Sequence, residues 1–164
     1  MLREFQNLTE EETQRMFDAI PKIAVLVAAA DDEIDDVEMQ KAQKLADIRS
    51  YNNRGQLNAY YEVVNDDLTN RIRRLHGELP ENTEERQAIL AERLGNLNAV
   101  LAKLPAPFGY LYYNSFRTYA KAIAESHGGF LRFITVGPKE QKVIDLPMLT
   151  PIAKPPVDEF PGLI

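Results

Sequence analysis

The chain has 164 residues, no cysteine and a formal net charge of −6, and 45% of its residues are hydrophobic. This length and composition suffice for one globular domain with a buried core. The acidic balance argues against a general nucleic-acid-binding protein, and the lack of cysteine excludes disulfides, thiolate metal sites and cysteine nucleophiles.

The sequence also argues against a membrane span. The uncharged, mostly apolar runs at residues 23–30 and 104–113 are far shorter than the roughly 20 residues that cross a bilayer. The N-terminal residues Met1-Leu2-Arg3-Glu4 include an acid where a signal peptide would have a basic segment. We therefore expect a cytoplasmic protein.

Two capping boxes predict helix starts near the N-terminus. Thr9 with Glu12 predicts a helix whose apolar face recurs at steps of three and four residues, at Met16, Ile20, Ile23 and Val27. Pro21 either kinks this helix or lies in the first turn of a second one, and both alternatives stay open. Asp35 with Glu38 predicts the start of a helix over residues 36–48.

The middle of the chain is predicted to be helical as well. After a turn at residues 51–55, an apolar stripe predicts a helix over 57–75, which residues 65–70 divide into two pieces. Asn82 with Glu85 predicts a helix to Leu104, and Pro107 suits the first turn of another that ends at Gly128-Gly129. Its aromatic cluster indicates core packing or a subunit interface, and consists of Tyr110, Tyr112, Tyr113, Phe116 and Tyr119.

The C-terminal part holds the remaining elements. Residues 130–136 are interpreted as a loop, and Pro138 predicts a short helix through about Leu146. Five prolines after residue 146 predict an extended tail. The sequence thus predicts a single all-α bundle of about six to eight helices over residues 1–148, followed by a Pro-rich tail over 149–164.

The most unusual stretch is the acidic cluster, with six carboxylates between residues 31 and 38 directly after an apolar run. Capping explains the carboxylates of Asp35 and Glu38, because anions are stabilised in the first turn of a helix. It does not explain Asp31 and Asp32, which follow the end of the preceding helix, where the dipole disfavours anions. Either they form a solvated loop, or a hard divalent cation offsets a repulsion of roughly 1 kcal/mol per close pair.

Two familiar cation sites are excluded. In an EF-hand loop beginning at Asp31, position six would be Asp36 in place of glycine, and position twelve would be Ala42 in place of glutamate. A ferritin-like site needs Glu-x-x-His pairs, but the residues three before His76 and His127 are Arg73 and Ala124.

A weak internal repeat relates two parts of the chain. Residues 23–38 and 119–140 each consist of an apolar helix with a small-residue end, a loop, and a helix with an acid in its first turn. Glu38 and Glu140 are the counterparts. Two such units would pack about a pseudo-twofold axis and could bring their loops together.

At these residues the chain resembles the tellurite-resistance TerB-like family. The first motif reads Ala30-Asp31-Asp32-Glu33-Ile34-Asp35-Asp36-Val37-Glu38, with Asp32 where the family has glycine; the second is residues 124–130 followed by Glu140. The resemblance covers Lys22–Met148. It implies an all-α fold of two related halves and a divalent-cation site drawn from Asp31, Glu38 and Glu140, helped by Asp32 and Asp35.

The functional prediction follows from the acids and this resemblance together. We expect a non-catalytic, divalent-cation-binding or ion-responsive module, linked to tellurite, metal or oxidant stress, that presents a surface to a protein partner. Oxygen ligands favour calcium or magnesium over zinc. The alternatives are an acidic interaction adaptor without metal, and a metal-dependent hydrolase in which His127 is the base. The arginines at 71, 73 and 74 are interpreted as a solvated helix face.

Overall fold

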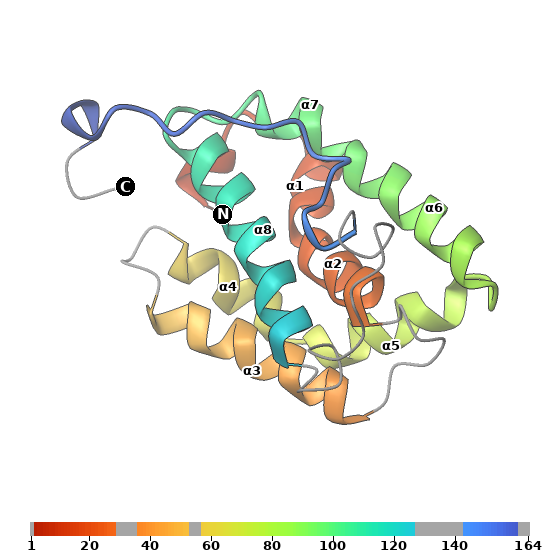
Figure 1. The fold of residues 1–164 in the computed structure, drawn as a ribbon. Helices are drawn as coiled ribbons and strands as arrows, with labels where there is room; N and C mark the ends of the chain where they lie inside the picture. The colour runs from red at the N-terminus through yellow and green to blue at the C-terminus, as the bar shows by residue number, and fades with distance from the viewer. Residues whose placement is uncertain (1, 29–35, 53–56, 127–142, 161–164) are drawn as a thin grey trace.

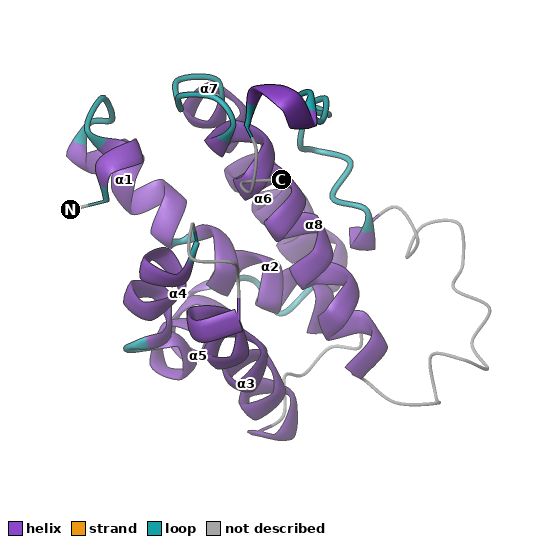
Figure 2. Ribbon diagram, turned by 90° about the vertical axis from the view of Figure 1, so that its left-hand side faces the viewer, coloured by secondary structure: helices purple, strands orange, loops and turns teal. Residues whose placement is uncertain are grey.

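The computed structural model describes residues 2–28, 36–52, 57–126 and 143–160, and all regular structure within these ranges is helical (Figures 1 and 2). This confirms the predicted all-α bundle. None of the described helices combines the length and apolar character needed to cross a membrane. The helices are α1 (Glu10–Phe17), α2 (Ala19–Ala28), α3 (Asp36–Asn52), α4 (Asn58–Asn65), α5 (Leu68–Glu78), α6 (Thr83–Gly95), α7 (Leu97–Leu101) and α8 (Phe108–Ser126), with short 3-10 helices at Arg3–Phe5 and Val157–Glu159.

The N-terminal capping box is present as predicted. The Thr9 hydroxyl accepts from the Glu12 backbone N–H at 3.2 Å, and the Glu12 carboxylate accepts from the Thr9 N–H at 3.0 Å. The chain then breaks at Asp18, between α1 and α2, so Pro21 lies in the first turn of a second helix. There its missing N–H removes no intrahelical hydrogen bond.

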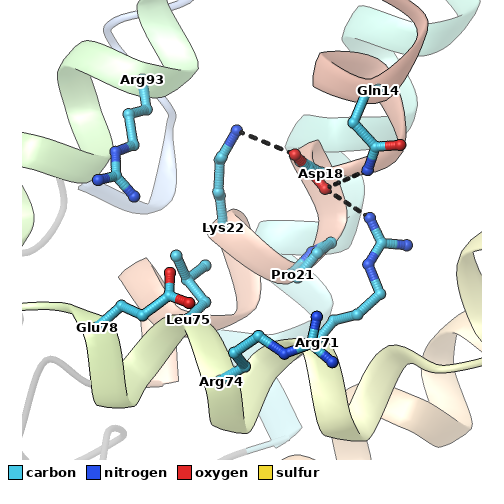
Figure 3. A pocket seen from close by; sticks show the side chains of 9 residues that line it. All are labelled: Gln14, Asp18, Pro21, Lys22, Arg71, Arg74, Leu75, Glu78 and Arg93. Carbon is cyan, nitrogen blue, oxygen red and sulfur yellow. Dashed lines mark hydrogen bonds and ion pairs between the residues drawn. The ribbon is translucent and has the colours of Figure 1, made fainter. Parts of the chain in front are cut away.

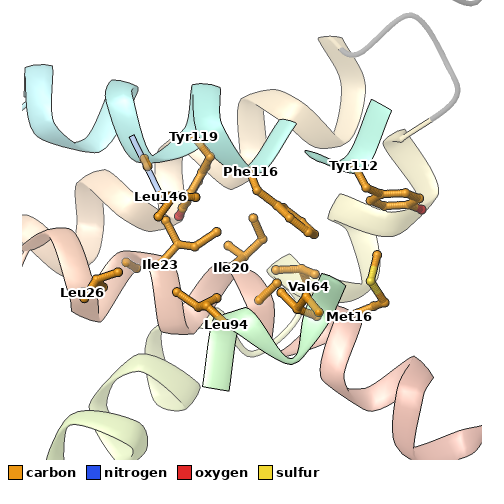
Figure 4. Packing of buried hydrophobic residues seen from close by; sticks show 14 of the residues in the cluster. Met16, Ile20, Ile23, Leu26, Val64, Leu94, Tyr112, Phe116, Tyr119 and Leu146 are labelled. Carbon is orange, nitrogen blue, oxygen red and sulfur yellow. The ribbon is translucent and has the colours of Figure 1, made fainter. Parts of the chain in front are cut away.

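Helix α2 is the centre of the bundle. Every residue of α2 except Lys22 is buried, and α1, α3, α5, α6 and α8 all pack on it. In Figure 4, Ile20 and Ile23 lie between Leu94 of α6 and the aromatic side chains of α8. A helix that is apolar on all sides is expected in such a central position, which explains the apolar run before the acidic cluster.

A cluster of aromatic rings fills the core around Tyr60. Its ring lies 5.0 Å from that of Tyr112 and 5.8 Å from that of Phe17, and its hydroxyl donates to the Met16 carbonyl at 2.7 Å. Tyr112 in turn donates to the buried carboxylate of Glu4 at 2.7 Å. The predicted core packing of the α8 aromatics is confirmed for Tyr112, Tyr113, Phe116 and Tyr119, which are buried.

Among the described residues, helix boundaries differ from the predicted ones by more than three residues in two places. The predicted division of the 57–75 stripe is confirmed, since α4 ends at Asn65 and α5 begins at Leu68. Helix α3 runs on to Asn52, past the predicted end at residue 48. The helix predicted from Asn82 to Leu104 is instead two, because the chain turns at Asn96 after Gly95, and both residues are poor helix formers.

The described beginning of the tail is docked on the bundle. Asn98 of α7 donates to the Met148 carbonyl at 2.9 Å and accepts from the Thr150 N–H at 2.8 Å. Leu149 is buried and Ile152 packs against the core, so the chain after Met148 follows α7 and α8 (Figure 1). The loop predicted at residues 130–136 and the helix start predicted at Pro138 lie outside the described residues.

Candidate functional site

The predicted cation ligands fall mostly outside the part of the chain that the structure describes. Asp31, Asp32, Asp35 and Glu140 lie in the undescribed ranges 29–35 and 127–142, as does His127. Glu38 is described, is half-buried, and lies in the first turn of α3. The neighbouring Asp36 is exposed and faces Arg73 of α5 at 3.6 Å.

The described helices nevertheless show where the two predicted motifs begin. Helices α2 and α8 pack against each other and run in the same direction, so Ala28 and Ser126 lie at one end of the bundle. The N-terminal end of α3, at Asp36, lies at that end too (Figures 1 and 2). We call this region, bounded by Ala28, Asp36 and Ser126, the shared end.

A buried contact orients α3 toward α8 near the shared end. The Tyr119 hydroxyl donates to the Ala42 carbonyl at 2.9 Å, and both residues are buried. Glu38 is four residues before Ala42 and therefore lies on the same face of α3, one turn nearer to the start of the helix. Glu38, in the first turn of α3, thus lies on the side of the helix that contacts α8.

The described residues alone do not form a metal centre. Within the described ranges, no group of three or more histidine, aspartate or glutamate side chains is placed to hold a metal ion. A cation site at the shared end would need ligands from residues 29–35 and 127–142, and it stays a prediction.

The structure also places charged residues together that the sequence analysis did not connect. A cavity of about 450 Å³ opens where α5 and α6 flank the junction of α1 and α2 (Figure 3). We call it the cationic pocket. Its charged lining consists of Lys22, Arg71, Arg74, Arg93, Asp18 and Glu78.

Asp18 organises the inner part of the cationic pocket. Its carboxylate accepts from Arg71 at 2.7 Å and from the Gln14 amide at 3.0 Å, and it faces the Lys22 ammonium at 3.9 Å. The Arg71 guanidinium also donates to the Phe17 carbonyl at 2.9 Å. These contacts anchor Arg71 to the end of α1, so interpreting this residue as part of a solvated face was wrong.

Lys22 is the most buried cation of the pocket. Only 14% of its side chain is exposed, and burial lowers the pKa of its ammonium. Asp18 opposes that shift, whereas Arg93, Arg15 and Arg71 add to it. One sequence signal could have drawn attention to this region, because Lys22 is the only charged residue between Ala19 and Ala30.

Comparison of the chain with known proteins identified no relative. The resemblance to the TerB-like family therefore rests on the motifs in the sequence. No protein-family model matches the chain, and neither a curated protein nor a solved structure is significantly similar to it.

Proposed function

We propose that the chain is a non-catalytic, ion-responsive helical module that binds a divalent cation at the shared end. The observation that supports this most directly is the convergence of α2, α8 and the first turn of α3 at one end of the bundle. These are the helices that lead into the two acidic motifs. Glu38, together with Asp31, Asp32, Asp35 and Glu140, would supply the ligands.

The ligand types indicate the ion. All five are carboxylates, and hard oxygen ligands suit calcium or magnesium better than zinc. A bound cation would connect the segment before α3 to the segment after α8, and so would bias the relative positions of these helices. The surface presented to a protein partner would then depend on the ion, in a cytoplasmic response to tellurite, metal or oxidant stress.

The proposal is tested by titrating calcium, magnesium, manganese and zinc into chelator-treated protein in a calorimeter. We expect saturable heat with calcium or magnesium, and its loss in the double variant Asp31→Asn, Glu140→Gln. Glu38→Gln should weaken binding, whereas Glu85→Gln, which changes the acid at the equivalent third position of α6, should not. No heat up to about 1 mM metal, or unchanged binding in the double variant, contradicts the proposal.

Further measurements separate the two alternatives. An acidic adaptor without metal predicts no effect of any cation on the melting temperature, and binding of a basic partner that weakens with salt. A hydrolase predicts metal-dependent turnover of a substrate and loss of that turnover in His127→Gln. A non-catalytic module predicts no turnover.

A further inference from the structure

The cationic pocket has a charge opposite to that of the protein as a whole. Four of the six charged residues that line it are cations and two are carboxylates, while the chain carries a formal net charge of −6. One carboxylate, Asp18, is already engaged by Arg71 and Gln14. The excess of positive charge is therefore local, and it faces a cavity.

The cations are arranged at two depths. Lys22 and Arg71 are largely buried in the inner part, whereas Arg74 and Arg93 are exposed at the entrance. Figure 3 shows Lys22 between Arg71 on one side and Arg93 on the other. Among the described residues, Arg74 and Arg93 have neither an ion pair nor a side-chain hydrogen bond.

This arrangement is unfavourable without a ligand. Burial and neighbouring guanidinium groups both disfavour a charged Lys22, and the Asp18 carboxylate, at 3.9 Å, offsets this only in part. An anion between Lys22, Arg71 and Arg93 would reduce the mutual repulsion of all three. Free energy lost in the unliganded fold would then be recovered on binding.

We propose that the cationic pocket binds the phosphate group of a small organic phosphate monoester. Guanidinium groups bind phosphate oxygens through paired N–H donors, and lysine adds a compact charge. A phosphate monoester carries close to two negative charges at neutral pH, which matches the excess of two cations in the lining. This proposal does not rest on the cation site at the shared end, because the two use different residues.

The size and the apolar lining favour an organic ester over free phosphate. A volume of about 450 Å³ lies within the range of small-molecule sites and is larger than a phosphate ion requires. Pro21 and Leu75 also line the pocket, beside Lys22 and Arg74 respectively (Figure 3). These two side chains provide a surface for the organic part of the ligand.

The test measures the melting temperature of the full chain in a chelator-containing buffer at constant ionic strength. The probes are inorganic phosphate, adenosine monophosphate as a representative monoester, and sodium chloride. We expect a saturable rise with adenosine monophosphate, a smaller one with inorganic phosphate and none with chloride. A calorimetric titration then gives the dissociation constants.

Substitutions at the pocket entrance locate the effect without disturbing the core. Arg93→Gln and Arg74→Gln should each weaken binding by about tenfold, as expected for the loss of a charge-assisted contact. Arg73→Gln is the matched control, because Arg73 is exposed on α5, as Arg74 is, but does not line the pocket. It should bind as the unchanged protein does.

Three results would overturn the proposal: no saturable response to either phosphate probe, an equal response to chloride, or equal weakening in Arg73→Gln. Stronger binding of inorganic phosphate than of the monoester would assign the pocket to the free ion and reject the organic ligand. Because chelator is present throughout, failure here leaves the divalent-cation proposal unaffected, and failure of the cation titration leaves this one unaffected.

Discussion

Two arginines reach into the bundle in different surroundings. Arg49 of α3 donates to the Ser115 carbonyl at 3.1 Å and to the Thr118 hydroxyl at 3.2 Å, and it lies over the rings of Tyr61 and Tyr119. All these partners are neutral. Arg71 of α5 instead faces a carboxylate and shares a cavity with three further cations.

The difference separates a structural cation from a binding one. The donors of Arg49 are matched by fixed carbonyl and hydroxyl oxygens, and its flat faces are covered by aromatic rings, so a ligand would find little left to satisfy. In the cationic pocket, positive charge exceeds negative charge around an open volume. The predictions that follow test whether the first arrangement serves stability and the second binding.

The largest effect should come from alkaline pH acting on the tyrosine-rich core beside Arg49. Burial raises the pKa of Tyr60, Tyr61, Tyr112 and Tyr119 above the ordinary value, and the contact with Glu4 raises that of Tyr112 further. The folded state therefore keeps protons that the unfolded state loses above a pH of about 10. Stability should fall by about 5 kcal/mol for each further pH unit, which unfolds the domain.

The measurement follows tyrosinate absorbance at 295 nm and helical circular dichroism between pH 9 and about 12. Ionisation of Tyr60, Tyr61, Tyr112 and Tyr119 should coincide with loss of the helical signal. Full ionisation of all seven tyrosines in a protein that keeps its helices would contradict the buried, dry core.

The second effect concerns Arg49 itself. Arg49→Met removes charge-assisted hydrogen bonds and two cation–π contacts, and leaves the Ser115 carbonyl and the Tyr61 hydroxyl without this donor. We expect the free energy of unfolding to fall by about 2–4 kcal/mol. Urea denaturation measures it.

Arg117→Met is the matched control for Arg49→Met. Arg117 also lies over a tyrosine ring, at 5.5 Å from the centroid of Tyr113, but its ion pair with Asp145 spans 3.6 Å and no hydrogen bond joins it to a backbone carbonyl among the described residues. Its loss should lower stability by about 1 kcal/mol or less. Equal losses in the two variants would show that the Arg49 contacts are not special.

The smallest and most discriminating effect is expected at Lys22. The pKa of Lys22 is lowered in the folded state, so its charged form destabilises the fold below that pKa, and stability recovers as pH rises toward 10.5. Lys22→Met should therefore stabilise the protein at pH 7, by about 0.5–1 kcal/mol, with an advantage that shrinks as pH rises toward the ordinary lysine pKa.

The same variant should bind adenosine monophosphate more weakly than the unchanged protein. A gain in stability with a loss of binding is the signature of a binding cation, whereas Arg49→Met should lower stability and leave binding unchanged, because Arg49 does not line the pocket. Lower stability of Lys22→Met at pH 7 would mean that Lys22 is held by its contact with Asp18 and serves the fold.

Local chemistry made most of the fold predictable. The Thr9 and Asn82 caps, the division of the stripe at residues 65–70 and the place of Pro107 before the last long helix depend on neighbours a few residues away. The break at Asn96 was missed because the apolar pattern continues through it. The side chain of Asn98 meets the backbone at Met148 and Thr150, a contact that no local pattern reveals.

The two candidate sites likewise differ in whether their residues are close together in the sequence. The acidic cluster is conspicuous in the sequence because its charges are adjacent, and the helices that lead into it meet at the shared end. The cationic pocket was not predicted, because Lys22, Arg71 and Arg93 are far apart along the chain. Arg71 also resembles an ordinary surface residue in a basic helix.

The helical class, the starts of the capped helices and the apolar character of the central helix follow from the sequence alone, because capping and periodicity act over a few residues. The three-dimensional structure was needed to show that Pro21 lies in the first turn of a second helix, that Arg49 meets neutral acceptors, and that cations from three helices share one cavity. Packing around α2 brings those distant residues together, and their electrostatic interactions depend on the distances that packing sets.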